Sequence, residues 1–209
     1  MARLPKPSLK PDIELQLMAE GYQCIVGIDE VGRGPIAGPV VAAAVILDLN
    51  NVPEGLGDSK AIPAKRREII YEEIMKTAQV AVAEVSHEEI DRINIRQATL
   101  QSMLRAVVGL KSIPDIALVD GNDPPPLSCK VTTIVKGDAK VASIAAASIV
   151  AKVTRDRFMA EISKQYPAYG FERNVGYGTA EHLAAIEANG PCPFHRMSFA
   201  PLRQGILAL

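Results

Sequence analysis

Three short apolar runs in this chain lead into acidic residues that lie close to glycine. The runs are CIVGID at 24–29, DIALV at 115–119 and VTTIV at 131–135. Apolar runs of this length, rich in β-branched residues and bounded by turn residues, are typical of buried strands. The acidic residues that close or follow them are Asp29, Glu30, Asp120 and Asp138. Strands that end in this way can bring several carboxylates to one edge of a sheet.

Helices and further strands surround these three runs. A link rich in glycine and proline joins the first run to the apolar stretch at 39–47, which predicts an antiparallel hairpin. Capping-box patterns at Ser86 and Asn94 predict two consecutive helices, and Pro63 suits the first position of another. The full set adds strands at 39–47 and 79–85, and helices at 63–77, after Ser86, after Asn94, from Asp138 to near Pro167, and near 180–189.

Composition limits the class of protein. A chain of 209 residues with 48% apolar content is long enough for one sizeable core, so we expect a single domain. A net charge of −1 excludes a globally basic nucleic-acid coat, so any such binding needs a local positive patch. Three cysteines without metal-ligand spacing argue against a disulfide framework and a zinc site. With no apolar run of membrane-spanning length, we expect a cytoplasmic protein that does not enter a membrane.

The converging carboxylates predict a metal site. Oxygen-only, partly hydrated sites suit hard divalent ions, and clustered carboxylates repel one another unless a cation neutralises them. Each acidic residue alone is also a common turn residue, so the pattern by itself leaves the function open. Neighbouring strand residues point to opposite faces, so Asp29 and Glu30 cannot both face one ion from an ideal strand. We therefore expect Glu30 to lie past the regular end of its strand or to reach back from the turn.

Several segments together resemble the bacterial ribonuclease HII family. They are GIDEVGRGPIAGPVVAAAVIL, GDSK, VDG, VKGDAKVASIAAASIVAKVTRDR, YGF and NVGYGTAEH, and the similarity extends from about Gly27 to HRMSFAP. The resemblance implies a ribonuclease H-like α/β fold. This is a mixed five-stranded sheet, its first three strands antiparallel, flanked by helices. The resemblance places an N-terminal extension at about 1–23 and a helical C-terminal extension, completing the substrate cleft, at about 167–209.

The resemblance also implies an activity. The family's four acidic positions map onto Asp29, Glu30, Asp120 and Asp138, which are expected to be catalytic and to bind Mg²⁺ or Mn²⁺. Two ions roughly 4 Å apart can activate water, relieve charge in the transition state and stabilise the leaving oxygen. The expected substrates are RNA-DNA hybrids and duplex DNA with embedded ribonucleotides. Cleavage on the 5′ side of the ribonucleotide would leave 3′-hydroxyl and 5′-phosphate ends. The resemblance implies a role in ribonucleotide excision repair and in removal of RNA primers. We expect the protein to be a monomer.

Two glycine-flanked motifs are candidates for substrate recognition. From spacing alone, Gly32-Arg33-Gly34 is a tight turn between strands. The resemblance instead puts its backbone near the ribose 2′-hydroxyl, with Arg33 on a phosphate. Tyr177 can anchor a loop to the core, whereas the resemblance implies that it packs on the sugar next to the ribonucleotide.

Other residues keep two interpretations each. Lys60 and Lys152 are either ordinary solvated charges, which is the default for a lysine, or residues that bind the substrate. Seven Lys/Arg lie between Lys136 and Arg173, which indicates a surface track for the phosphates of the substrate. Ser143 and Ser148 either pack on the sheet or contact the substrate strand. The remaining predictions concern His182 and His195, which we expect to be structural, and the tail 204–209, which resembles a sliding-clamp-binding peptide or packs on the domain.

Two other functions compete with this interpretation. A resolvase-like DNA nuclease shares the broad fold and the carboxylate chemistry, but the two glycine-flanked motifs argue against it. A binding module without catalysis gains nothing from an acidic cluster in the path of phosphates. A duplex with one ribonucleotide, compared with an all-DNA duplex, separates these alternatives.

Overall fold

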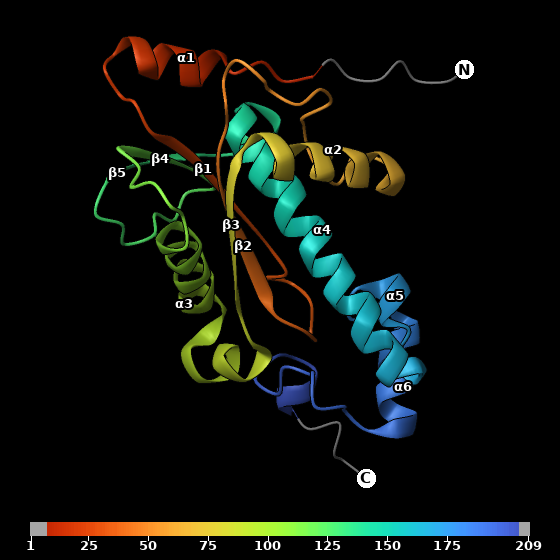
Figure 1. The fold of residues 1–209 in the computed structure, drawn as a ribbon. Coiled ribbons are helices and arrows are strands. Elements are labelled where there is room, and N and C mark those ends of the chain that lie inside the picture. The colour runs from red at the N-terminus through yellow and green to blue at the C-terminus, as the bar shows by residue number, and fades with distance from the viewer. Residues whose placement is uncertain (1–7, 205–209) are drawn as a thin grey trace.

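The computed structural model describes residues 8–204, and its centre is one five-stranded sheet. The strands are β1 (Ile25–Val31), β2 (Val40–Ile46), β3 (Gln79–Val85), β4 (Ile116–Asp120) and β5 (Lys130–Ile134). Their order is β3-β2-β1-β4-β5 (Figure 1). β1, β2 and β3 pair antiparallel, whereas β4 and β5 continue the sheet in parallel with β1. The predicted mixed sheet with three antiparallel opening strands is confirmed.

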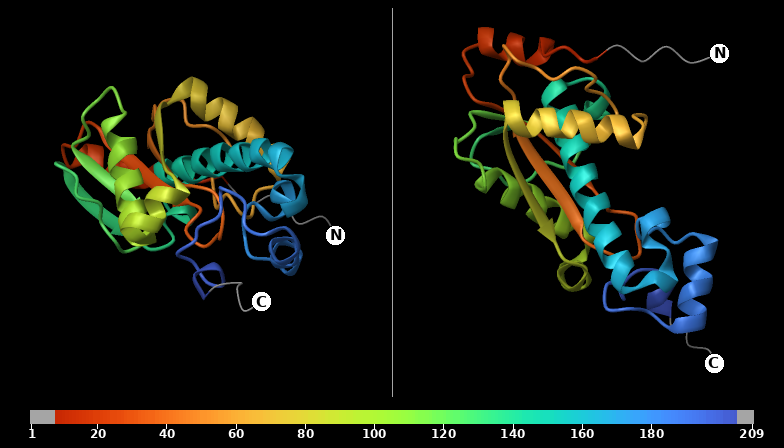
Figure 2. Two further views of the ribbon diagram at one scale, coloured as in Figure 1. Left: turned by 90° about the horizontal axis from the view of Figure 1, so that it is seen from below. Right: turned by 45° about the vertical axis from the view of Figure 1, so that its right-hand side comes forward.

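Helices cover both faces of the sheet (Figure 2, left). On one face, β2 side chains pack in one cluster with side chains of α2 and α4. On the other face, β1, β2 and β4 pack with α3. The helices and 3-10 turns are α1 (Asp12–Ala19), α2 (Ala64–Thr77), α3 (His87–Val108), η1 (Gly137–Ala139), α4 (Ala142–Gln165), η2 (Pro167–Tyr169), α5 (Phe171–Asn174), α6 (Ala180–Asn189) and η3 (Leu202–Gln204). Within residues 8–204, no helix is long and apolar enough to cross a membrane.

α4 lies unusually close to β1 because both elements carry small residues where they meet. A Cβ added to Gly27 would overlap the backbone of Ser143 and Ile144. The first ten residues of α4, from 142 to 151, are all buried. The run of alanine and serine in this half of the helix therefore sets the distance between helix and sheet.

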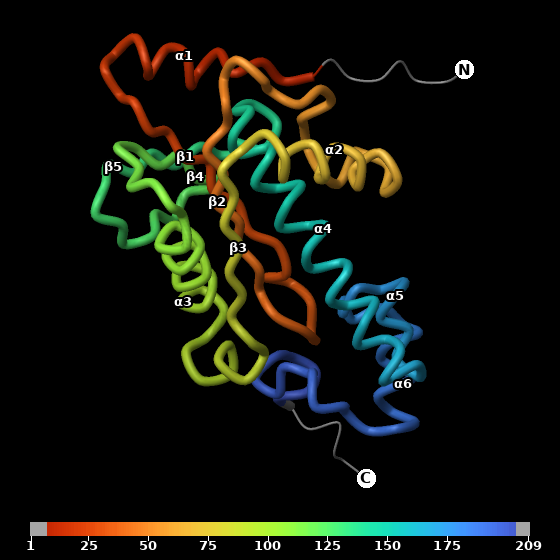
Figure 3. The backbone as a smooth tube through the Cα atoms, viewed as in Figure 1, coloured from red at the N-terminus to blue at the C-terminus, as the bar shows by residue number. Residues whose placement is uncertain are grey.

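The C-terminal extension packs at the far end of α4 (Figure 2, right). Met159 and Ile162 of α4 share a buried cluster with Phe171 and Ile186, and Ile36 from the β1–β2 link joins them. The chain then runs to the start of α3 (Figure 3), where Asp91 accepts hydrogen bonds from the Met197 and Ser198 backbone N–H groups. Residues 197–198 thus connect the C-terminal extension to α3.

The predicted elements are present with small shifts. Asn94 has φ 66° and ψ 163°, and its side chain accepts from Gln97 N, so α3 consists of the two predicted helices joined at a kink. Pro63 is the N-cap of α2 and not its first residue. The long helix begins at Ala142 and not at Asp138, because Asp138 lies in the separate 3-10 turn η1. α1 and α5 were not predicted, since eight and four residues give little periodicity.

The contact between Gly27 and α4 yields a stability prediction. Gly27→Ala forces the helix away from the strand and should reduce the free energy of unfolding by about 1–3 kcal/mol, the usual cost of overpacking a core. Urea unfolding monitored by circular dichroism measures it. Gly57→Ala is the matched control, because an added Cβ there meets no atom within 4 Å. Equal stability of the two variants would contradict the proposed close packing.

Candidate active site

Four carboxylates lie where the parallel strands end. Pairing of β1 with β4 stops at Ile28 and Val119, so Asp29 and Glu30 follow the last pair on β1 and Asp120 follows it on β4. Asp138 lies in η1, directly after β5. Because β1, β4 and β5 run parallel, these ends meet at one edge of the sheet. The strand predictions therefore placed Asp120 at the end of β4 and Asp138 after β5, whereas β1 runs past Asp29 and Glu30 to Val31.

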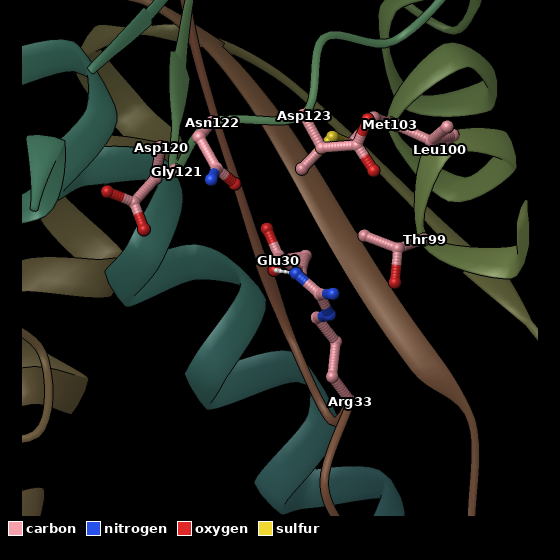
Figure 4. A pocket seen from close by; sticks show the side chains of 9 residues that line it. All are labelled: Glu30, Arg33, Thr99, Leu100, Met103, Asp120, Gly121, Asn122 and Asp123. Carbon is pink, nitrogen blue, oxygen red and sulfur yellow. Dashed lines mark hydrogen bonds and ion pairs between the residues drawn. The ribbon is translucent and has the colours of Figure 1, made fainter. Parts of the chain in front are cut away.

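Glu30 does not leave its strand, so the expectation that it lies past the regular end was wrong. Glu30 pairs with Ala42 inside the β1–β2 ladder, and strand alternation sends it to the face opposite Asp29. It lines a small hollow of about 20 Å³ together with Thr99 and Met103 of α3 (Figure 4). The two carboxylates therefore lie on opposite sides of the end of β1, because pairing with β2 continues beyond them.

The carboxylates act on one another electrostatically. Burial, with Glu30 and Asp120 nearby, raises the pKa of Asp29 well above its usual range, and a hydrogen bond from Ser148 opposes this shift. Burial also raises the pKa of Glu30, although Arg33 lowers it. The pKa of Asp138 is raised by burial and then by Asp120. Asp120 thus contributes a repulsive charge to each of the other three.

Hydrogen bonds and ion pairs fix the surroundings of two of these groups. Asp120 Oδ1 accepts from the Gly137 backbone N–H at 2.6 Å, which ties the end of β4 to η1. Arg33 Nη1 lies 3.3 Å from Glu30 Oε1, and the Arg33 side chain is 51% exposed (Figure 4). In this structure Arg33 therefore pairs with the Glu30 carboxylate.

The four carboxylates fit a divalent cation in their chemistry. They offer only oxygen, and their mutual repulsion is what a bound cation relieves. Within residues 8–204, however, no group of three His, Cys, Asp or Glu side chains is already arranged to hold an ion. Binding therefore requires side-chain rotation, and the pairing of Glu30 with Arg33 is one contact that would change.

Tyr177 lies beside the GRG loop. A Cβ added to Gly34 would stand 3.5 Å from Tyr177 Cε1, and Tyr177 is 44% exposed. The segment is anchored by the backbone carbonyl of Tyr177 and not by its ring. The carbonyl oxygen accepts a hydrogen bond from the Thr179 backbone N–H and lies next to His182 Nδ1, and both distances are 2.8 Å. The ring therefore stays free at the surface next to Gly34.

The two predicted serines differ in placement. Ser148 is close to Asp29, and its hydroxyl lies 2.9 Å from the Ser59 hydroxyl of the GDSK segment. Ser143 is fully buried against β1, and its backbone N–H donates to Glu14 Oε1 at 2.7 Å. This placement favours packing for Ser143.

The basic residues do not all face solvent, so the predicted phosphate track is smaller than expected. Arg155 is fully buried. Lys152 Nζ lies 2.7 Å from Asp156 Oδ1, and the other paired members are Arg157, Lys164 and Arg173. Lys60 is exposed, and its positive charge partly offsets the rise in the pKa of Asp138 that burial and Asp120 cause.

Near this region Asp58 and Arg196 were missed, and Arg155 was counted among the surface charges. Asp58, in the GDSK segment, raises the pKa of Asp138. Arg155 and Arg196 lie beneath the β1–β2 link and donate to its carbonyl groups. Asp58 and Arg196 fall within quoted motifs, GDSK and HRMSFAP, which was the available signal. His182 and His195, expected to be structural, are buried with their Nε2 atoms 3.0 Å apart.

The raised pKa of Asp29 predicts a stability cost of its charge. Since the folded state binds this proton more tightly than the unfolded chain, ionised Asp29 destabilises the fold above its folded-state pKa. The cost disappears as pH falls below the unfolded value of about 3.9. In EDTA at pH 8, Asp29→Asn should raise Tm by about 2–4 °C, and the difference from wild type should shrink towards pH 4. The exposed Glu187→Gln is the control, and a lower Tm for Asp29→Asn at pH 8 would contradict the prediction.

Comparison with known proteins agrees with this geometry. The family model described as Ribonuclease HII matches residues 26–202. A protein named Ribonuclease HII from Xanthobacter autotrophicus is 59% identical over 196 residues, which cover 94% of this chain and 79% of that protein.

Solved structures give the same result. The ribonuclease H2 from Pyrococcus horikoshii OT3 superposes with a TM-score of 0.74 at 26% identity, covering 87% of this chain and 96% of that chain. The RNase HII from Archaeoglobus fulgidus, solved as a complex with PCNA, gives 0.72 at 30% identity, covering 85% and 95%. The chain therefore belongs to the ribonuclease HII family and is a ribonuclease H.

Proposed function

We propose that the protein cuts the RNA-containing strand of RNA-DNA hybrids and of duplex DNA with embedded ribonucleotides. Cleavage falls on the 5′ side of the ribonucleotide and leaves 3′-hydroxyl and 5′-phosphate ends, in ribonucleotide excision repair and primer removal. The observation that carries the proposal is the position of Asp29, Glu30, Asp120 and Asp138 at or directly after the ends of three parallel strands, in a chain whose GRG loop follows Glu30 closely.

Asp29, Glu30, Asp120 and Asp138 would hold Mg²⁺ or Mn²⁺ as two ions. When bound, such ions activate water and stabilise charge on the phosphate and the leaving oxygen. The protein's own residues position the reaction. Ser148 and burial against α4 orient Asp29, and the Gly137 N–H holds Asp120. Lys60 supplies positive charge for neighbouring phosphates, and Lys152 does so when it leaves its ion pair with Asp156.

The GRG loop and Tyr177 recognise the ribonucleotide. Gly32 has φ +96°, and a Cβ there would overlap Arg155, so the fold itself requires glycine at 32. At Gly34 a Cβ meets only the Tyr177 ring, so the fold does not require glycine there. The absence of a side chain at 34 supports close approach of a ribose, with Tyr177 packing on the adjacent sugar and Arg33 on a phosphate.

A contact with a sliding clamp remains a prediction. Residues 205–209 of the proposed clamp-binding tail lie outside the described residues.

Cleavage mapping tests the reaction. On a duplex with one ribonucleotide, the wild type should cut only on its 5′ side, only with Mg²⁺ or Mn²⁺, and should leave an all-DNA duplex intact. Asp138→Asn should lower kcat at least about 100-fold, because it removes a proposed metal ligand. Cutting on the 3′ side, or cutting without a divalent ion, would overturn the proposal, and cutting of the all-DNA duplex would favour a DNA nuclease.

The two glycines of the GRG loop should behave differently. Gly34→Ala should change the free energy of unfolding by less than about 0.5 kcal/mol, yet reduce cleavage of the single-ribonucleotide duplex about 100-fold. Gly32→Ala should lose stability as well as activity, because its Cβ overlaps Arg155. Thermal melting and kcat/KM measure both quantities. Full activity of Gly34→Ala would argue against ribose approach at this residue.

A further inference from the structure

Two arginines lie buried beneath the link between β1 and β2. Arg155 of α4 and Arg196 of the C-terminal extension are each 0% exposed. Within residues 8–204, every hydrogen bond of the two guanidinium groups goes to a backbone carbonyl. A buried charge without a carboxylate partner is costly to desolvate, so these carbonyls are its main compensation. Most of these carbonyls belong to the loop from 32 to 39.

Arg196 holds the part of the loop that contains the GRG motif. Its Nη2 donates to Gly32 O at 2.6 Å, and its Nη1 donates to Arg33 O at 3.2 Å and Pro35 O at 2.8 Å. Its Nε donates to Gly38 O at 2.9 Å. Only the planar, five-donor fork of arginine can serve four carbonyls at once, whereas a lysine ammonium has three donors on one atom.

The inward carbonyls determine where the loop N–H groups point. In a trans peptide the C=O of one residue and the N–H of the next point in opposite directions. The Gly32 and Arg33 carbonyls point at Arg196, so the Arg33 and Gly34 N–H groups point away from it. Within the described part of the chain, neither N–H donates to another group. Both residues are exposed, so their donors are available to a ligand.

We infer that Arg196 is a positioning residue that determines specificity, because it aims the Arg33 and Gly34 N–H groups at the ribose 2′-hydroxyl. The inference rests on the proposed function, in which the GRG loop approaches the ribose. The hydroxyl oxygen accepts these hydrogen bonds, and a deoxyribose offers no acceptor at that position. Preference for a ribonucleotide thus depends on a side chain that does not touch the substrate.

The test measures binding of two duplexes of identical sequence, one with a single ribonucleotide and one all-DNA. Fluorescence anisotropy, with Ca²⁺ as the only divalent ion, gives both dissociation constants, and a gel checks that neither duplex is cut. Arg196→Lys keeps the charge and removes the fork. It should lower the preference for the ribonucleotide about tenfold, the size expected for misaligned hydrogen bonds, while all-DNA binding stays unchanged.

Two further variants separate the effect of the Arg196 contacts from a general loss of stability. Ile186→Ala removes a buried side chain from the hydrophobic cluster of the C-terminal extension. It should lower Tm and leave the binding preference for the ribonucleotide duplex unchanged. Phe199→Leu removes the ring 5.0 Å from the Arg196 guanidinium and should weaken the preference about threefold. If Arg196→Lys does not fold, the comparison of Phe199→Leu with Ile186→Ala decides the question.

The outcomes separate the inference from the proposed function. Undiminished preference in folded Arg196→Lys, or in Phe199→Leu if the lysine variant does not fold, would overturn the inference. Equal loss of preference in Ile186→Ala would overturn it too, because general loosening would then explain the effect. A wild type that binds both duplexes equally would instead count against ribose recognition itself.

Discussion

The close packing of α4 on β1 is the contact on which the rest of the molecule depends. Gly27 admits the helix backbone, and Ser148 further along the helix then reaches Asp29. Two helical turns later, Arg155 donates to carbonyls of the β1–β2 link. Met159 packs in the buried hydrophobic cluster that includes Phe171 and Ile186 of the C-terminal extension. Because one rigid helix makes all these contacts, the carboxylate edge and the GRG loop keep a fixed relation to each other.

Buried charge of both signs surrounds the end of β1. In the anionic part, burial and then neighbouring acidic groups raise the pKa values of Asp29 and Asp138, and a bound cation would relieve this repulsion. The cationic part consists of Arg155 and Arg196, whose pKa values burial lowers to about 10 and about 9. Both arginines therefore remain protonated at neutral pH, held by carbonyl dipoles. The two parts have different roles. The carboxylates serve the proposed metal-dependent reaction, and the arginines stabilise the conformation of the β1–β2 link.

The sequence predicted the sheet edge and not the detailed placement of its side chains. Strand ends could be located because apolar runs stop there, so Asp120 and Asp138 were correctly placed. Glu30 was misplaced, because the end of its pairing with β2 depends on the partner strand and not on local sequence. Arg155 was counted as a surface charge because it lies in the charged half of its helix. Its burial depends on the extension that begins after Gln165, a contact that periodicity does not reveal.

The two glycines of the GRG motif show why a motif can hold two kinds of constraint. Gly32 is required from inside the protein, by a left-handed backbone and by Arg155 behind it. Gly34 has open space and the Tyr177 ring in front of it, so its constraint must come from outside, from the ligand that approaches. A loop that reads a small hydroxyl through its backbone has few ways to be adjusted by side chains. Its selectivity therefore rests on rigidity, which the buried arginines provide from a position the substrate does not reach.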